Sequence, residues 1–498
     1  MTPIGTETAE RAIHCARAAE GRPRRAGRAA LGPSHQAFSW GRTSIIGLAL
    51  AAALRAGSAA AETTLTLTEV FASIDHYNPR LEAARAAERE AEGHYLNARG
   101  AFDPNLLGGA TWQGGTYPSR QVDIGVYQPT PFWGLDLHAG YRISDGDFPV
   151  YKGKNFTGSL GELSAAASIP IYRGGPIDRA RADRMQTEIG VVAARARLRA
   201  ERLALRAAAA SAYAEWVRLS WNLAIDAKLL QLAEERQEWI EAKAEMGALA
   251  PIVAVDNRSL LVLRQLRLVE ATRQRDQAAV RLALYLRAED GVMSPPAQQR
   301  VPESLKLPPE EVPEARDDRD APARPEVDVL GAQADIASTE LRLRQNHVAP
   351  DARLHGFVAR DFGETKDGLD ERDIGLGVTL RWPVPLRRER GARDAAEGRK
   401  AAIDAELQWT TDQISTEVEG ADISVAAARQ AIALADEQRV LAERLAAAER
   451  ETFEEGFSTL VIVNLRELTA AEAAKSARNA EVAVFLAALE ARRARGTL

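Results

Sequence analysis

The sequence is poor in the residues on which most site chemistry depends. Its only cysteine, Cys15, lies within the first 61 residues, so the remaining chain can form no disulfide and offers no thiol nucleophile or thiolate metal ligand. The five later histidines have no spacing typical of a metal site, and neither a phosphate-binding loop nor a nucleophile elbow occurs. The sequence therefore predicts a protein that is not an enzyme and holds no cofactor or metal ion.

Long apolar runs are also missing. After residue 61 no segment reaches the roughly eighteen consecutive apolar residues of a transmembrane helix. The short apolar run 44–54 is followed by small residues at Ala59 and Ala61, which predicts a signal peptide or N-terminal extension over 1–61, cleaved near Ala61. This segment holds 8 of the 64 Lys and Arg and 3 of the 70 Asp and Glu, so its removal changes the net charge from -6 to about -11. No basic surface for nucleic acid remains.

Proline is absent from the interior of residues 176–247, where the only interior glycine is Gly190. The segment consists largely of strong helix formers. A helix of seventy residues is about 105 Å long, whereas a compact domain of this size has a radius of gyration of about 22 Å. A turn at 247–251 leads into a second helical run, 252–288. The sequence thus predicts a very long antiparallel helical hairpin, with a coiled-coil seam of Ile225, Leu229, Leu232, Arg236 and Trp239 in which Arg236 is a charged exception.

The chain is an internal duplication. Residues 79–104 and 325–350 align without a gap, and about 37 additional residues follow in the first copy. The predicted first repeat, 62–289, has a helix (66–99), strands within 105–172 and the hairpin described above. A proline-rich connector, 290–323, joins it to the second repeat, 324–498, which is predicted to have helices at 323–346, 388–455 and 458–494 and strands within 352–384.

Two features of helix packing are expected from these lengths and spacings. Leu434, Leu441 and Ala448 fall seven residues apart with Leu445 between them, which predicts another coiled-coil seam. The return helix 252–288 is shorter than its partner, so we expect helix 323–346 to stack on its end, and the C-terminal helix to pair likewise with 66–99.

The β regions alternate between apolar and polar residues. In 133–143 and 373–382 every second residue is apolar, and the intervening positions include the predicted lumen-facing residues Asp136, His138, Arg142, Asp373, Thr379 and Arg381. Further strand candidates are 106–113, 122–127, 163–171 and 354–362. About ten residues is the length of a tilted strand that crosses a membrane.

A soluble sandwich is the alternative for any single strand of this kind, but the long helices cannot supply a layer to cover such a sheet. In lipid an open sheet leaves edge amides unpaired at several kcal/mol each. A closed barrel must therefore be shared by several chains.

Motifs in a fixed order, repeated in both copies, carry a family resemblance. They are 78–81 and 324–327 at the start of each copy, 169–175 and 384–386 between strand and helix, and the turns 247–257 and 456–464. Over residues 64–496 the chain resembles the TolC-like outer membrane efflux proteins, the outer membrane factor family. With the patterns above, this resemblance implies a fold class that is mainly α with membrane β: duplicated coiled-coil hairpins forming an α-barrel, with strands contributing to a shared trimeric transmembrane β-barrel.

The resemblance implies a homotrimer in the outer membrane lipid of a Gram-negative bacterium, with a long periplasmic extension. Twelve strands, two per repeat in each chain, would form the barrel. Such proteins conduct drugs, metal ions or proteins outward, passively, in tripartite efflux or type I secretion systems. An inner-membrane transporter supplies the cargo through a periplasmic adaptor protein that docks on the tips, here Gly247, Ala248, Leu249, Gly456, Phe457 and Ser458. Opening would be an untwisting of the coiled coils near these tips.

Two departures from the family pattern concern the barrel and the pore. The extra residues near 114–155 predict either an added hairpin or a long external loop. The stretch after Gly456 is apolar through Val463, where related proteins often have acidic residues. Possible pore-mouth charges are instead Asp256, Glu451, Glu454 and Glu455, for which an exposed, solvated position is the alternative. A different class, a periplasmic coiled-coil adaptor or structural protein, would share the long helices but has no use for lipid-facing strands.

Overall fold

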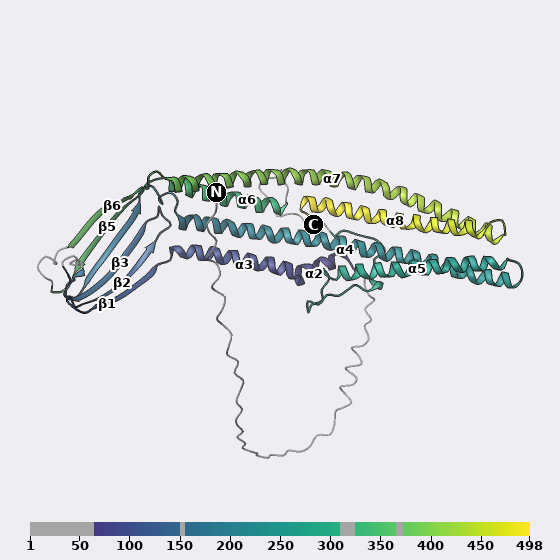
Figure 1. Cartoon of the computed structure of the whole chain (residues 1–498), viewed down its shortest axis with the longest axis horizontal. Coiled ribbons are helices and arrows are strands. Elements are labelled where there is room, and N and C mark those ends of the chain that lie inside the picture. The colour runs from purple at the N-terminus through teal and green to yellow at the C-terminus, as the bar shows by residue number, and fades with distance from the viewer. Residues whose placement is uncertain (1–63, 150–154, 309–323, 365–371) are drawn as a thin grey trace, which may run out of the picture. The chain divides into compact units, whose positions relative to one another are not determined.

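The computed structural model describes residues 64–149, 155–308, 324–364 and 372–498; the predicted signal segment and the last part of the connector lie outside these ranges. The described residues belong to one compact unit, Glu62–Leu498. Its helices are α2 (Leu67–Tyr77), α3 (Pro79–Arg99), α4 (Arg179–Glu245), α5 (Pro251–Leu282), α6 (Pro325–His347), α7 (Arg387–Glu454) and α8 (Leu460–Arg495), and its strands are β1 (Asn105–Gln113), β2 (Ser119–Pro129), β3 (Asp136–Gly146), β4 (Glu162–Pro170), β5 (Asp351–Asp361) and β6 (Arg372–Arg381) (Figure 1).

The two long helices form as the sequence predicts. Helix α4 has 67 residues and α7 has 68, so each is about 100 Å long. The N-terminus of α4 is capped by Asp178, whose carboxylate accepts a hydrogen bond of 2.8 Å from the Arg181 amide. Gly247 after α4 and Gly456 after α7 have φ angles of 74° and 87°. These left-handed conformations favour glycine, and at each of the two turns they let the backbone reverse into the return helix.

The first predicted helix, 66–99, is wrong as a single element, because the chain breaks at Asn78. A residue before proline is disfavoured in the α conformation, and Asn78 has a ψ angle of 120°. Its side-chain oxygen accepts a hydrogen bond of 3.0 Å from the Arg80 amide and so caps α3, with Pro79 as its first residue. The return helix α5 also ends earlier than predicted, at Leu282.

The predicted end-to-end stacking is wrong, because α2, and not α6, continues the line of α5. The Ser73 hydroxyl accepts a hydrogen bond of 2.7 Å from the Arg287 amide just beyond α5, and Ile74 shares a core with Leu282 and Leu286. Helix α6 instead packs between α4 and α7 and lies in line with α8 (Figure 1). The apolar residues of α2 pack against those at the end of α5, and this packing determines which helix stacks on α5.

The largest core lies where α2, α4, α8 and the end of α5 meet. Trp216 of α4 is fully buried there, beside Tyr213 and Phe485. The Tyr213 hydroxyl donates a hydrogen bond of 2.8 Å to the Leu65 carbonyl, and the Trp221 indole donates one of 2.9 Å to the Pro302 carbonyl. The first part of the connector is therefore fastened to the middle of the helical region.

The predicted leucine seam of α7 is not used within the chain. Leu434, Leu441 and Leu445 are 67%, 52% and 52% exposed. The buried side chains of α7 are mostly alanines at neighbouring positions, among them Ala435, Ala442 and Ala446. Small residues allow close approach to α8, so the leucines are left as an outward-facing stripe.

All six strands lie in one antiparallel sheet with the order β1-β2-β3-β4-β5-β6. Four strands come from the first repeat and two from the second, so the expected count of two per repeat is wrong. The extra residues form a hairpin, β2–β3, because Val122, Ile124 and Val126 alternate with polar residues in register with β3. Its turn is held where strands meet helices: the Trp133 indole donates a hydrogen bond of 3.1 Å to the Pro170 carbonyl.

Candidate functional site: a two-faced sheet and linked helical tips

The sheet has one continuous apolar face. The strand registers place one apolar residue from each strand side by side in a row across the whole sheet: Leu106, Val126, Ala139, Ala165, Val358 and Ile374. Parallel rows contain further large apolar side chains, such as Leu376, which is 84% exposed. Within the part of the chain that the structure describes, no long helix packs against the sheet. The apolar face is therefore exposed in the single chain, and a continuous exposed apolar surface of this kind marks a site of contact with a partner or a membrane.

The opposite face is polar, and it carries all six strand residues singled out from the sequence: Asp136, His138, Arg142, Asp373, Thr379 and Arg381. Arg142 pairs with Asp123 at 2.7 Å and Arg353 with Asp136 at 2.6 Å. Sequence reasoning missed Asp123 and Arg353, although Asp123 stands between the apolar residues Val122 and Ile124 and the same alternation identifies its face.

The two hairpin turns lie together at the end of the helices opposite the sheet (Figure 1). Phe457 is 83% exposed, and the Ser458 hydroxyl donates a hydrogen bond to the Glu449 carboxylate. Turn residues Gly247, Ala248 and Gly456 are exposed and Leu249 is half-buried. Of the candidate pore-mouth charges, the structure groups Glu451, Glu454 and Glu455 at the end of α7 and places Asp256 on the other hairpin, all four exposed.

A buried charge cluster joins the two hairpins. It consists of Arg236 of α4, Arg264 of α5 and Glu467 of α8, whose exposures are 9%, 4% and 3%. One carboxylate oxygen of Glu467 pairs with Arg236, and the other lies 3.3 Å from Arg264. Arg236 also donates a hydrogen bond of 2.5 Å to the Asn464 amide oxygen, and Arg264 one of 2.6 Å to the Leu229 carbonyl. Burial lowers the pKa of Arg264, and the adjacent Glu467 carboxylate opposes that shift.

Sequence reasoning noted Arg236 as an exception in its seam but missed its partners. A signal for them exists. Glu467 follows the buried residues Leu460 and Val463 at helical spacing, and Arg264 follows the buried Leu261 by three positions. When three neighbouring helices have charged residues at seam positions at the same height along their axes, these residues are expected to form one shared cluster.

Two further contacts link the hairpins. The rings of Trp239 on α4 and Phe453 on α7 are 5.7 Å apart, and Lys475 of α8 pairs with Asp226 of α4 at 2.5 Å. The charge cluster lies between these two contacts along α4, roughly 16 Å from the Gly247 turn. The last few turns of both hairpins are therefore held together by aromatic, ionic and buried polar contacts.

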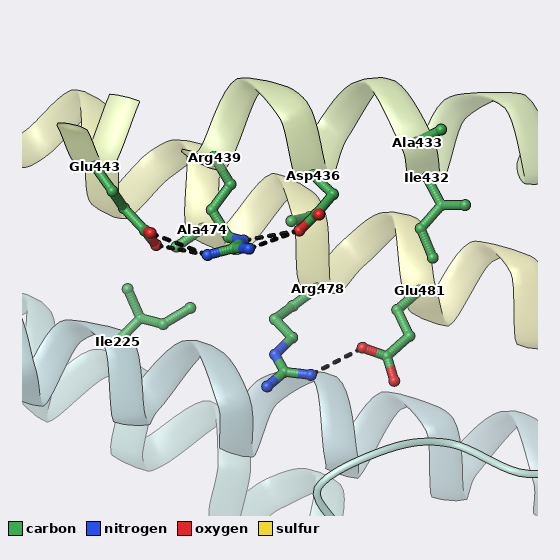
Figure 2. A pocket seen from close by; sticks show the side chains of 10 residues that line it. Ile225, Ile432, Ala433, Asp436, Arg439, Glu443, Ala474, Arg478 and Glu481 are labelled. Atoms are coloured by element: carbon green, nitrogen blue, oxygen red, sulfur yellow. Dashed lines mark hydrogen bonds and ion pairs between the residues drawn. The ribbon is translucent and has the colours of Figure 1, made fainter. Parts of the chain in front are cut away.

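A groove of about 710 Å³ separates α4 from α7 and α8 on one side (Figure 2). Arg439 pairs with Asp436 and Glu443, and Arg478 pairs with Glu481 at 2.9 Å. Arg478 also lies 4.6 Å from the centre of the Trp221 ring. Each of these five charged side chains has an ion-pair partner within the groove, so none of them is left unpaired to bind a ligand.

Two searches of the described residues gave negative results. Over 64–149, 155–308, 324–364 and 372–498, no group of three or more His, Cys, Asp or Glu side chains is placed to hold a metal ion. None of the helices in the same ranges combines the length and apolar character needed to cross a membrane.

The chain shares its fold with bacterial outer membrane channels. No protein-family model and no curated protein sequence matches it. Among solved structures it is similar to the outer membrane protein VceC of Vibrio cholerae (19% identity, 86% of this chain and 96% of that chain, TM-score 0.61). It is also similar to the CmeC outer membrane channel of Campylobacter jejuni (15%, 86% and 85%, TM-score 0.59) and to the MtrE outer membrane channel of Neisseria gonorrhoeae (17%, 86% and 88%, TM-score 0.58).

These similarities confirm, at the level of the fold, the resemblance to TolC-like channels that the repeated motifs predict. The fold is mainly α with a membrane-type β part: two long antiparallel hairpins attached to one antiparallel sheet.

Proposed function

We propose that the chain is an outer membrane exit duct of a tripartite efflux or type I secretion system, which passively conducts its cargo outward. The observation that carries this proposal is the exposed apolar face that runs across all six strands. The strands have 9 to 11 residues each, which is the length that a tilted strand needs to cross the hydrocarbon layer. The polar face, including the six predicted residues, would then line the lumen.

The sheet edges support self-association. Strands β1 and β6 are the two ends of the sheet, and an unpaired edge in lipid costs several kcal/mol for each unsatisfied amide. Because successive strands alternate in direction, β1 and β6 are antiparallel to each other. The β6 edge of one copy can therefore pair with the β1 edge of the next, and a ring of copies closes the barrel.

The helices provide matching edges. The outward stripe of α7 consists of Trp409, Ile423, Leu434, Leu441 and Leu445, and a second exposed stripe on α5 consists of Val255, Val262, Leu266, Val269 and Val280. At about 100° per residue the stripe spans about 40° on α7 and about 60° on α5. Helices α7 and α5 form opposite edges of the chain near the tips, since α4 and α8 lie between them.

The two stripes also lie at the same level. The members from Leu445 to Ile423 are about 9 to 31 residues from the end of α7, and those from Val262 to Val280 are about 11 to 29 residues from the start of α5. Copies that associate head to tail would bury one stripe against the other. We take three as the number of copies from the family resemblance, which gives a homotrimer with a hollow α-barrel.

The turns at the free end are the proposed docking surface for a periplasmic adaptor that connects the duct to an inner-membrane transporter. Opening at this end requires the two hairpins of each chain to separate, and this strains the Arg236, Glu467 and Arg264 cluster. The four acidic residues around the turns are candidates for the pore mouth. No residue of the chain is assigned a catalytic role.

Cell fractionation separates this proposal from a periplasmic adaptor or structural protein. We expect the protein to sediment with the outer membrane and to migrate as a heat-resistant oligomer of three chains in detergent. Recovery as a soluble monomer after osmotic shock would contradict the duct and favour the alternative.

A substitution on the apolar face tests the contact with lipid. Leu376 lies in the middle of β6, and replacement by arginine at the bilayer midplane is expected to cost about 2–4 kcal/mol. Thr379→Arg is the control, because it adds the same side chain to the polar face of the same strand. Denaturant unfolding in lipid vesicles measures both. Equal effects of the two substitutions would mean that lipid does not face Leu376.

A further inference from the structure

The sheet register shows how steeply the strands would tilt in a closed barrel. Residues paired across neighbouring strands form the row Pro129, Asp136, Ser168, His355 and Gly377. Pro129 and Asp136 are the residues at the helix-side ends of β2 and β3. Ser168 lies two residues from the helix-side end of β4, and His355 and Gly377 lie four residues from the helix-side ends of β5 and β6. If the helix-side ends of the strands are placed at one level, the position of the paired residue therefore shifts by about one residue along each successive strand.

This climb corresponds to a definite tilt. A shift of one residue, about 3.3 Å, over a strand separation of about 4.8 Å gives a tilt of about 35°. Membrane barrels have strands tilted by roughly 35–45°. The five strands of this row thus already have the stagger of an arc of a barrel. Strand β1 continues it, because its first residue, Asn105, pairs with Tyr127, two residues from the end of β2.

We infer that three copies close an eighteen-stranded barrel, an inference that rests on the homotrimer proposed above. At about 4.8 Å between strands and a tilt of about 35°, eighteen strands have a perimeter of about 105 Å and a backbone diameter of about 34 Å. Twelve strands with the same tilt would have a diameter of about 22 Å.

The helical part fits the wider barrel. Next to the sheet, α3, α4, α6 and α7 lie side by side in each chain (Figure 1). Twelve helices from three copies, about 9 Å apart, form a ring of about 108 Å perimeter. Eighteen strands therefore continue the helical ring with almost no change in width, whereas twelve strands with this tilt would narrow it at the membrane.

The β2–β3 hairpin is built into this wall. Its strands pair along their full length with β1 and β4. Its turn packs closely against the residues that precede α4. A Cβ atom added to Gly134 would lie 2.7 Å from the Gly174 carbonyl oxygen, and one added to Gly175 would lie 2.7 Å from the Trp133 indole nitrogen. The hairpin therefore widens the exit for cargo and leaves the order of the other strands unchanged.

Distances between spin labels test the strand number. A single label at Ala165→Cys, in a Cys15→Ser background that has no other cysteine, places one label on each copy at the same level of the barrel. In a three-fold ring the distance between equivalent backbone sites is about 29 Å for eighteen strands and about 19 Å for twelve. The label adds a similar offset in both cases.

The control is the same labelled chain without residues 115–160, which removes the hairpin and joins β1 to β4. We expect its label distance to fall by about 10 Å. A three-chain particle whose full-length form already has the shorter distance overturns the eighteen-stranded barrel and leaves the duct intact. Absence of a three-chain particle overturns the duct itself. If the shortened chain does not fold, the full-length distance and a strand count from electron microscopy of the trimer decide the matter.

Discussion

Replacing Glu467 by alanine is expected to cost about 3–5 kcal/mol, because it leaves two buried guanidinium groups without their carboxylate. Arg236 and Arg264 are 9% and 4% exposed, so neither gains full hydration in return. The loss falls on the contact between α8 and the α4–α5 hairpin. We therefore expect the hairpins to separate more often close to the tips, where the proposed duct opens.

Hydrogen exchange of the α8 amides around residue 467 in the purified oligomer measures this effect. If separation of the hairpins is the opening that exposes these amides, their protection falls by about two to nearly four orders of magnitude. Glu443→Ala is the control, since the Glu443 carboxylate is 49% exposed and pairs with Arg439 at 2.9 Å. An exposed pair contributes roughly 0–1 kcal/mol. Similar changes in the two variants would contradict the role of the cluster.

A triple variant separates a missing partner from a general loss of packing. Replacing Arg236 and Arg264 by methionine and Glu467 by leucine removes all three charges while keeping most of the volume. Apolar replacement of a whole buried ion cluster is often neutral or stabilising, whereas removal of one member is strongly destabilising. We expect the triple variant to regain most of the protection that Glu467→Ala loses.

The sequence was most informative where local physics decides the structure. Helices α4 and α7 follow from strong helix formers without proline, and their ends follow from Gly247 and Gly456. Most strands follow from alternation, but for the extra residues near 114–155 the sequence left a hairpin and a long loop open, and the structure decides for the hairpin. The break at Asn78-Pro79 was also readable, since the pair is a typical helix start, but the surrounding helical composition concealed it.

The missed features depend on which surfaces meet. An apolar position indicates burial but does not name the partner, so the stacking of α2 on α5 could not be read from helix lengths. Leu434 and Leu441 have the spacing of a seam, yet the chain packs α7 through Ala435 and Ala442. The spacing marks Glu467 and Arg264 as charged residues at seam positions, but which residues they pair with depends on how three helices are placed.

The outward leucines of α7 give the second large prediction: Leu434→Glu combined with Leu441→Glu is expected to abolish the trimer. Each of the three proposed interfaces would bury two carboxylates against the apolar stripe of α5, at several kcal/mol for each unpaired ion. The fold of the single chain should survive, since both leucines are more than half exposed within it. Light scattering of the protein in detergent measures the number of chains per particle.

A matched control adds the same charge to α7 at Ala426 and Ala447, which are exposed and lie at least about 60° away from the stripe. It should remain trimeric, and a control that dissociates equally would show that charge alone disrupts assembly.

A compensating change tests the partner directly. Val262 and Leu266 on α5 lie at about the level of Leu441, so Val262→Lys with Leu266→Lys should restore part of the trimer to the double-glutamate variant. Restoration requires the two stripes to face each other across the interface, because within one chain α4 and α8 keep α5 and α7 apart.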